Sequence, residues 1–147
     1  MKVLMVCLGN ICRSPLAEGI LKSKSDQFFV DSAGTADYHL GKAPDPRSIL
    51  EASKHGIDIK DQKARQVVPD DFDRFDVIFA MDPSVLEDLK QMAPTDAHKE
   101  KIKLILENNP KTNAVPDPYY DGPEGFAFVY DLLDKALEDF VQNPVFP

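Results

Sequence analysis

The sequence predicts an α/β fold in which helices cover both faces of an open parallel β-sheet. Short, continuously apolar segments are typical of strands buried on both faces, and here they alternate with stretches of helical pattern. Such alternation favours parallel strands joined by right-handed crossovers. The length of 147 residues fits a single domain spanning residues 1–147. Ligands bind these sheets at the carboxyl ends of the strands, so the loop at residues 7–14 is the candidate site.

Four apolar segments predict the strands. The first is apolar throughout after Lys2, the second contains Phe28-Phe29-Val30, and the third contains Val77-Ile78-Phe79-Ala80. The fourth has apolar residues at positions 102 and 104–106. The expected strands therefore cover residues 2–6, 28–32, 76–81 and 101–106.

Four helices are expected after these strands. Ser14 followed by Pro15 is a favoured helix start, His55-Gly56 is a favoured stop, and Asp82 can cap the third helix. The last helix is amphipathic, because its apolar residues recur at helical spacing: Phe126, Val129, Leu133, Leu137 and Phe140. The expected helices cover residues 14 to about 25, 47–54, 82 to about 92, and 125–141.

Charge and composition exclude several classes of partner. Asp and Glu number 25 against 17 Lys and Arg, so the net charge of −8 disfavours binding to nucleic acid or to an anionic membrane. No apolar stretch has the length of a transmembrane helix, and the N-terminal one is too short for a signal peptide. Cys7 and Cys12 are too close together to staple a secreted fold. We therefore expect a cytoplasmic protein.

The loop from Cys7 to Ser14 has the residues of an anion cradle. A loop that leads into a helix directs backbone N–H groups and the positive end of the helix dipole inward. Gly9 and Asn10 tolerate positive φ, and Arg13 offers a planar fork to two phosphate oxygens. These groups favour a thiolate at Cys7, placed for in-line attack on phosphorus, and Ser14 can donate a hydrogen bond to the sulfur. The predicted phosphate-binding residues are Leu8, Gly9, Asn10, Ile11, Cys12, Arg13 and Ser14.

Other interpretations of this loop are weaker. A buried structural cysteine in a strand-to-helix turn leaves the neighbouring Gly, Arg and Ser unexplained. A dinucleotide site is disfavoured because Gly9 is the only glycine in the turn. His39, His55 and His98 are scattered without ligand spacing, so no metal is expected.

With these motifs the chain resembles the low-molecular-weight protein tyrosine phosphatase family from Lys2 to about Phe140. The segments that carry the resemblance are residues 6–15, 31–35, 64–67, 81–82 and 117–120. The resemblance implies a four-stranded parallel sheet in a flavodoxin-like, three-layer arrangement. It also implies hydrolysis of phosphotyrosine through a phosphocysteine intermediate, with no metal or cofactor. Tyrosine-phosphorylated proteins would be its substrates, and we expect a monomer or weak dimer.

Asp117 is the expected general acid and base. A tyrosine leaving group needs a proton, and a carboxylic acid at a fixed place can supply it. Asp117 lies between Pro116 and Pro118, which restrict its backbone. This pattern fits a rigidly held general acid and an aspartate with only a structural role in a turn equally well. The resemblance decides for the catalytic role. Cys7 is then the nucleophile and Arg13 the phosphate clamp.

The resemblance also implies a pocket wall and supporting residues. The wall would consist of Leu8, Tyr38, His39, Tyr119 and Tyr120. The two adjacent tyrosines could instead pack the loop or serve as targets of a tyrosine kinase. Asn10, Ser14 and Ser32 would support the cradle through hydrogen bonds. Many relatives carry a His before residue 64, so Gln62 replaces it here or the loop is held differently.

Two further assignments stay open at this stage. Asp82 is expected to cap its helix rather than reach the site. Cys12 is either a small apolar residue behind the loop or the redox partner that captures an oxidised Cys7 in a disulfide, and the resemblance favours the second.

Three rival functions are disfavoured. A thioredoxin-coupled arsenate reductase passes electrons along further cysteines, and this chain has only two. Phosphoarginine phosphatases resemble this loop but carry Thr where Ile11 stands. A catalytically dead phosphotyrosine-binding module would be expected to lose Cys7, Arg13 or Asp117.

Overall fold

The computed structural model describes residues 1–144 and contains a four-stranded parallel sheet. Its strand order is β2-β1-β3-β4, which confirms the expected fold class. The strands are β1 (Lys2–Cys7), β2 (Phe29–Gly34), β3 (Val77–Ala80) and β4 (Ile102–Leu104). The central strand β1 pairs in parallel with β2 on one side and β3 on the other. Residues 3–6 of β1 are fully buried, as the continuous apolar run predicts.

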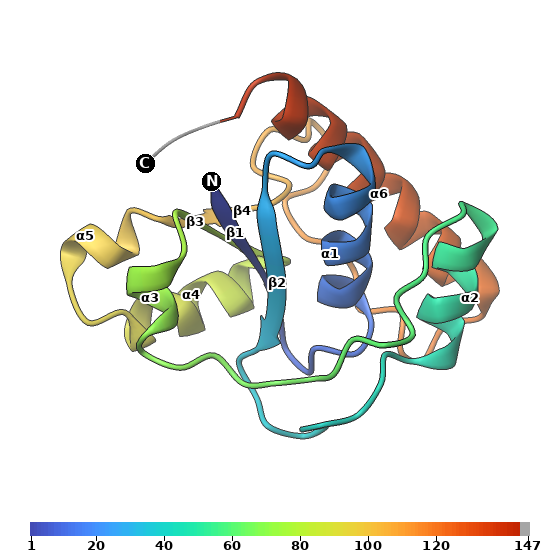
Figure 1. The fold of residues 1–147 in the computed structure, drawn as a ribbon, viewed down its shortest axis with the longest axis horizontal. Coiled ribbons are helices and arrows are strands. Elements are labelled where there is room, and N and C mark those ends of the chain that lie inside the picture. Colours follow the sequence, from blue (N-terminus) through green and yellow to red (C-terminus); the bar gives the residue numbers. More distant parts are fainter. Residues whose placement is uncertain (145–147) are drawn as a thin grey trace.

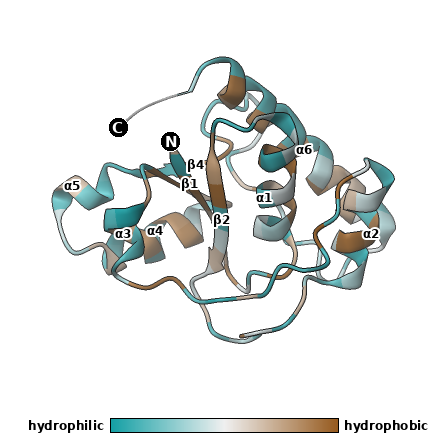
Figure 2. Cartoon of the chain, viewed as in Figure 1, coloured by the Kyte–Doolittle hydropathy of each residue, from teal (hydrophilic) through white to brown (hydrophobic). Residues whose placement is uncertain are grey.

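Helices cover both faces of the sheet (Figure 1). On one face lie α1 (Arg13–Lys24), α2 (Pro46–Lys54) and α6 (Pro123–Gln142); on the other lie α3 (Asp71–Arg74) and α4 (Pro83–Met92), with α5 (Asp96–Lys99) at the margin. Side chains alternate along β1, so Val3 and Met5 enter the core beneath α1 and α6 while Leu4 and Val6 enter the core beneath α3 and α4. Two apolar cores therefore hold three layers together, and Figure 2 shows the hydrophobic residues along the strands.

The bounds of the four expected helices differ from the expectation by at most two residues, but the N-cap residue of α1 was predicted wrongly. Cys12, not Ser14, occupies the N-cap position, and no side chain among residues 1–144 caps this helix. Ser14 was therefore wrongly predicted as the cap, because its hydroxyl lies 3.0 Å from the Sγ atom of Cys7 instead. Gly56, with φ of +77°, follows α2 as predicted. The prediction missed the four-residue helices α3 and α5, which are too short for a periodic pattern.

Strand lengths also differ at the edges of the sheet. β2 extends to Gly34, two residues beyond the expected end, and β4 is limited to Ile102–Leu104. A Cβ atom on Gly34 would lie 2.7 Å from the backbone oxygen of Leu8, so only glycine permits this close approach of β2 to the first loop.

No helix within residues 1–144 combines the length and apolar character needed to cross a membrane.

Candidate functional site

The loop between β1 and α1 curls around the sulfur of Cys7. This residue ends β1 and is 2% exposed. Its Sγ atom accepts a hydrogen bond from the backbone N–H of Asn10 (3.3 Å) and lies 3.0 Å from Ser14 Oγ. Asn10 has φ of 58°, as its residue type allowed. Gly9 does not adopt positive φ; a Cβ atom there would instead approach the ring of His39 to 3.0 Å.

Asn10 is held from three directions. Its side-chain amide donates to Ser14 Oγ (2.8 Å) and to Ser32 Oγ (3.1 Å), and its Oδ1 atom accepts from the backbone N–H of Arg65 (3.0 Å). Ser32 in turn donates to the buried carboxylate of Glu18 (2.6 Å). The expected pairing of Asn10 with Ser32 is thus present, and the strained turn at Asn10 is fixed by surrounding structure.

Gln62 does not join this network. Its Nε2 atom donates to the backbone oxygen of Pro15 (3.1 Å), and its buried Oε1 atom lacks a hydrogen-bond partner within residues 1–144. Of the two alternatives expected for this position, the second applies. The cradle is held differently, by the backbone N–H of Arg65, whose side chain binds Asp31 and Asp71.

Arg13 is fixed under the cradle with 4% of its surface exposed. Its Nη1 atom donates to Asp82 Oδ2 (2.6 Å) and to the backbone oxygen of Val115 (3.0 Å). Burial alone would lower the pKa of the guanidinium, but the negative charges of Cys7, Asp82 and Asp117 raise it above its usual value. Asp82 also caps α4 by accepting from the N–H of Val85 (2.8 Å), so it performs both roles considered for it.

Asp117 extends over the cradle from the loop between β4 and α6. Its Oδ2 atom lies 3.9 Å from Arg13 Nη2, and its Oδ1 atom accepts from the backbone N–H of Tyr119 (3.1 Å). The side chain is 50% exposed, so it is open to an incoming ligand. The loop is anchored upstream, where the N–H of Val115 donates to the backbone oxygen of Met81 at the end of β3 (2.8 Å).

These groups share one hollow of about 380 Å³. Its lining contains the sulfur, the guanidinium and the carboxylate, together with every residue of the expected pocket wall: Cys7, Leu8, Gly9, Ile11, Cys12, Arg13, Tyr38, His39, Asp117, Tyr119 and Tyr120. Asn10 and Ser14 do not line it; both are buried and hold the cradle from behind. Tyr120 is 95% exposed, so in this structure it lines the mouth of the hollow rather than its depth.

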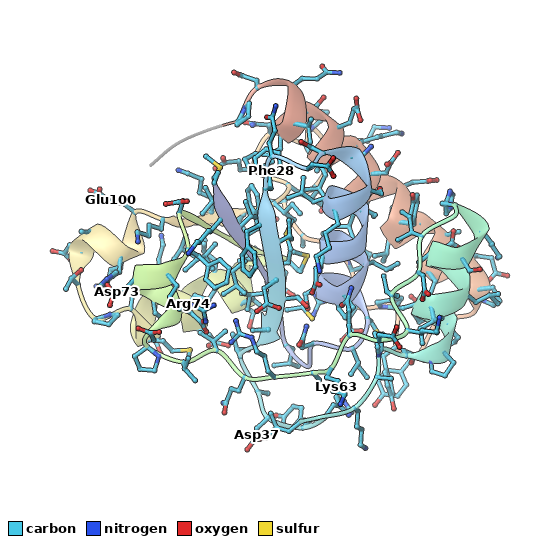
Figure 3. The ribbon with its side chains drawn as sticks, in the orientation of Figure 1. Phe28, Asp37, Lys63, Asp73, Arg74 and Glu100 are labelled. Atoms are coloured by element: carbon cyan, nitrogen blue, oxygen red, sulfur yellow. The ribbon has the colours of Figure 1, made fainter. Side chains whose placement is uncertain are left out.

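The loop that carries Tyr38 is braced by a second loop, around Ala64, which lies outside the hollow. The backbone of Ala64 exchanges hydrogen bonds with Gly41 and Lys42, each 2.8 Å long. Figure 3 marks the two loops by Asp37 and Lys63, below the sheet.

A second hollow, of about 460 Å³, lies between α6 and the segment after β4 and contains none of the predicted site residues.

Cys12 is a buried thiol, 4% exposed. Burial raises its pKa from 9.0 to about 12, and the negative charges of Asp45 and Cys7 add to the effect. At neutral pH this thiol therefore stays protonated. Both cysteines are free in the structure.

A family model described as low molecular weight phosphotyrosine protein phosphatase matches residues 2–144. The chain belongs to this family. A Synechocystis protein whose name places it in the same phosphatase family is 43% identical over 151 residues, covering 97% of this chain and 96% of the relative. A phosphatase of the family from Dictyostelium discoideum is 38% identical over 165 residues, with coverage of 97% and 92%. The resemblance stated from the motifs is thus confirmed.

Solved structures agree with this phosphatase family. The protein tyrosine phosphatase of Entamoeba histolytica, with Hepes in its active site, superposes with a TM-score of 0.91 at 40% identity, covering 97% of this chain and 95% of that one. Vibrio vulnificus Wzb in complex with benzylphosphonate gives a TM-score of 0.89 at 31% identity, with coverage of 96% and 97%.

Sequence reasoning missed three contributors to this phosphatase site. Glu18 was not among the expected site residues, yet its position four residues after Ser14 places both on one face of α1, toward β2. Arg65 acts through a backbone N–H, which no side-chain pattern reveals. The carbonyl of Val115 likewise carries no sequence signal for its bond to Arg13.

Proposed function

We propose that the protein hydrolyses phosphotyrosine in proteins through a phosphocysteine intermediate, without a metal. Cys7 is the nucleophile, Arg13 the phosphate clamp, and Asp117 the general acid and then the general base. The observation that carries the proposal is the shared hollow of about 380 Å³, in which a thiol, a buried guanidinium and an exposed carboxylate meet beside aromatic side chains.

In the first step the thiolate of Cys7 attacks phosphorus while the bond to the tyrosine oxygen breaks. The leaving phenolate takes a proton from Asp117, whose Oδ2 atom lies 3.9 Å from the clamp. Backbone N–H groups of the cradle and Arg13 hold the equatorial phosphate oxygens. The salt bridge to Asp82 and the bond to Val115 keep the guanidinium in place throughout.

In the second step water attacks the phosphocysteine. Asp117, now a carboxylate, takes a proton from the water, and the bond between sulfur and phosphorus breaks. The departing thiolate is stabilised by the hydroxyl of Ser14 (3.0 Å) and the N–H of Asn10 (3.3 Å). Inorganic phosphate then leaves, and the cradle is restored.

The depth of the hollow supports selectivity for tyrosine. Leu8 and Tyr119 are each 40% exposed and flank the entrance, while Cys7 lies at the base with 2% exposed. A phosphotyrosine ring spans this depth and contacts apolar side chains on the way. Phosphoserine is too short to reach the sulfur, and Ile11 in the lining offers no hydroxyl to a phosphoarginine group.

A panel of phosphopeptides tests this function. Matched peptides carrying phosphotyrosine, phosphoserine or phosphoarginine are assayed for phosphate release, with and without EDTA. We expect activity on phosphotyrosine alone, unaffected by chelator. A preference for phosphoarginine, or loss of activity in EDTA, would overturn the proposal.

A further inference from the structure

Arg47 of α2 binds the loop that carries Asp117 at residues that follow Asp117 in the chain. Its Nη2 atom donates to the backbone oxygen of Tyr119 (2.8 Å), and its Nη1 atom donates to that of Asp121 (3.1 Å). The guanidinium also lies over the rings of Phe126, 4.6 Å from the centroid, and of Tyr119, 5.6 Å away. One side chain thus binds the loop through two carbonyl groups and the ring of Tyr119, and it also contacts α6 through Phe126.

The same guanidinium is fixed to the cradle through Asp45. The carboxylate of Asp45 accepts from Nε (3.0 Å) and Nη2 (2.8 Å) of Arg47, and its side chain is only 8% exposed. The backbone N–H of Asp45 donates to the oxygen of Ile11 in the cradle (2.8 Å), and Ser48 Oγ donates to that of Cys12 (3.2 Å). A continuous set of hydrogen bonds therefore joins the two walls of the hollow.

Asp117 lies midway between two anchored points of its loop. Upstream, Val115 is bound to Met81 and to Arg13; downstream, Tyr119 is bound to Arg47. Within residues 1–144, the side chain of Asp117 makes only the bond from the N–H of Tyr119 and the long contact to Arg13. Its place over the cradle consequently depends on the downstream anchor.

We propose that Arg47 is a positioning residue that holds Asp117 where it can protonate the leaving group. The inference rests on the proposed function, because it concerns the same general acid. Lysine cannot replace Arg47, since an ammonium group lacks the planar fork that here serves one carboxylate, two carbonyls and two rings. Loss of this hold leaves the nucleophile and the phosphate clamp intact but displaces the acid.

The dependence of the activity loss on the leaving group distinguishes a positioning role from a merely structural one, because structural damage would lower kcat/KM equally for all esters. General acid catalysis contributes about 10²–10⁴-fold, and only where the leaving group needs a proton. We expect Arg47→Gln and Arg47→Lys to lower kcat/KM for phosphotyrosine by about 10–100-fold. For aryl phosphates with strongly acidic phenols the loss should stay within about threefold, and inhibition by inorganic phosphate should be unchanged.

Three further variants complete the experiment. Arg74→Gln is the matched control, since Arg74 on α3 contacts Phe75 and Asp71, outside the hollow; it should behave as wild type on every ester. Asp117→Asn should reproduce the leaving-group selectivity, and combining it with Arg47→Gln should add little. Retained activity on the acidic esters shows that each variant is folded, and Arg47→Lys serves if Arg47→Gln does not fold.

The outcomes separate the two proposals. If Asp117→Asn is selective but both Arg47 variants lose activity equally on all esters, or lose none, Arg47 is not a positioning residue and the proposed function stands. If Asp117→Asn itself shows an equal loss on all esters, the role proposed for Asp117 fails, and the inference about Arg47 fails with it.

Discussion

The sulfur of Cys7 and the hydroxyl oxygen of Ser14 lie 3.0 Å apart in a buried setting, one at the end of β1 and the other in the first turn of α1. The same hydroxyl accepts from the side-chain amide of Asn10 (2.8 Å), so its own proton is directed to the sulfur. This contact stabilises a negative sulfur more than a neutral one. It should therefore matter most when the phosphocysteine breaks down.

Ser14→Ala should slow the second step more than the first. A hydrogen bond to a charged group contributes about 1.5–3 kcal/mol, so hydrolysis of phosphocysteine should slow by about 10–100-fold. With an aryl phosphate that has a good leaving group, a pre-steady-state burst of phenol close to one per site should appear. Ser23→Ala, on the same helix and outside the hollow, is the control. The role assigned to Ser14 would be wrong if no burst developed and both steps slowed alike.

Cys7→Ser should abolish turnover while leaving oxyanion binding in place. A serine hydroxyl is not ionised in a site suited to a thiolate, whereas the N–H groups and Arg13 that hold phosphate remain. Calorimetry with inorganic phosphate should give a Kd within a few-fold of wild type. Substantial residual phosphatase activity in this variant would show that another group attacks phosphorus.

Asp117→Asn should slow hydrolysis of phosphotyrosine by about 10²–10³-fold and that of esters with acidic phenols far less. The amide cannot donate an acidic proton, and a good leaving group needs none. Asp88→Asn, on an exposed part of α4, is the control. An equal loss across the leaving-group series would mark Asp117 as structural.

Peroxide should inactivate the enzyme reversibly through a disulfide between Cys7 and Cys12. Peroxide oxidises the Cys7 thiolate to a sulfenic acid, and the sulfur of Cys12 then displaces its hydroxyl group as water, forming the S–S bond. The raised pKa of Cys12, about 12, keeps it a thiol at neutral pH, so Cys7 is the sulfur that reacts first. A dithiol should restore activity, and bound phosphate should slow the inactivation.

Cys12→Ser should be active but lose activity irreversibly, because no thiol captures the sulfenic acid before further oxidation. Recovery after dithiol treatment and mass spectrometry of the loop peptide measure this. If the variant recovers as fully as wild type, or if the mass of the wild-type peptide does not fall by two hydrogen atoms, Cys12 serves only to pack behind the cradle.

The features predictable from sequence were those with a local or periodic signal. The apolar run of β1 and the residues around Cys7 identified the sheet and its loop, and Asn10 was recognisable as a residue suited to positive φ. Contacts between distant segments had no such signal, and those of Ser32 and Asp117 with the cradle were expected only from the family resemblance. The N–H of Arg65 on Asn10 and the side chain of Arg47 on Tyr119 depend on how loops meet in space. The prediction that Ser14 caps α1 was wrong because a serine hydroxyl suits both a helix cap and a hydrogen bond to sulfur. In the structure the hydroxyl lies beside the buried sulfur of Cys7.

The two bonds made by Val115, through its N–H to Met81 and through its oxygen to Arg13, divide the segment after β4 into independent parts. A change in the length of the segment between β4 and Val115 should not displace Asp117, because these two hydrogen bonds hold Val115 in place. An inserted peptide near Lys111, which is exposed, should be tolerated, whereas one added residue between Val115 and Tyr119 would shift the carboxylate. The length of this loop can thus vary before Val115, whereas between Val115 and Tyr119 it cannot change without moving the general acid.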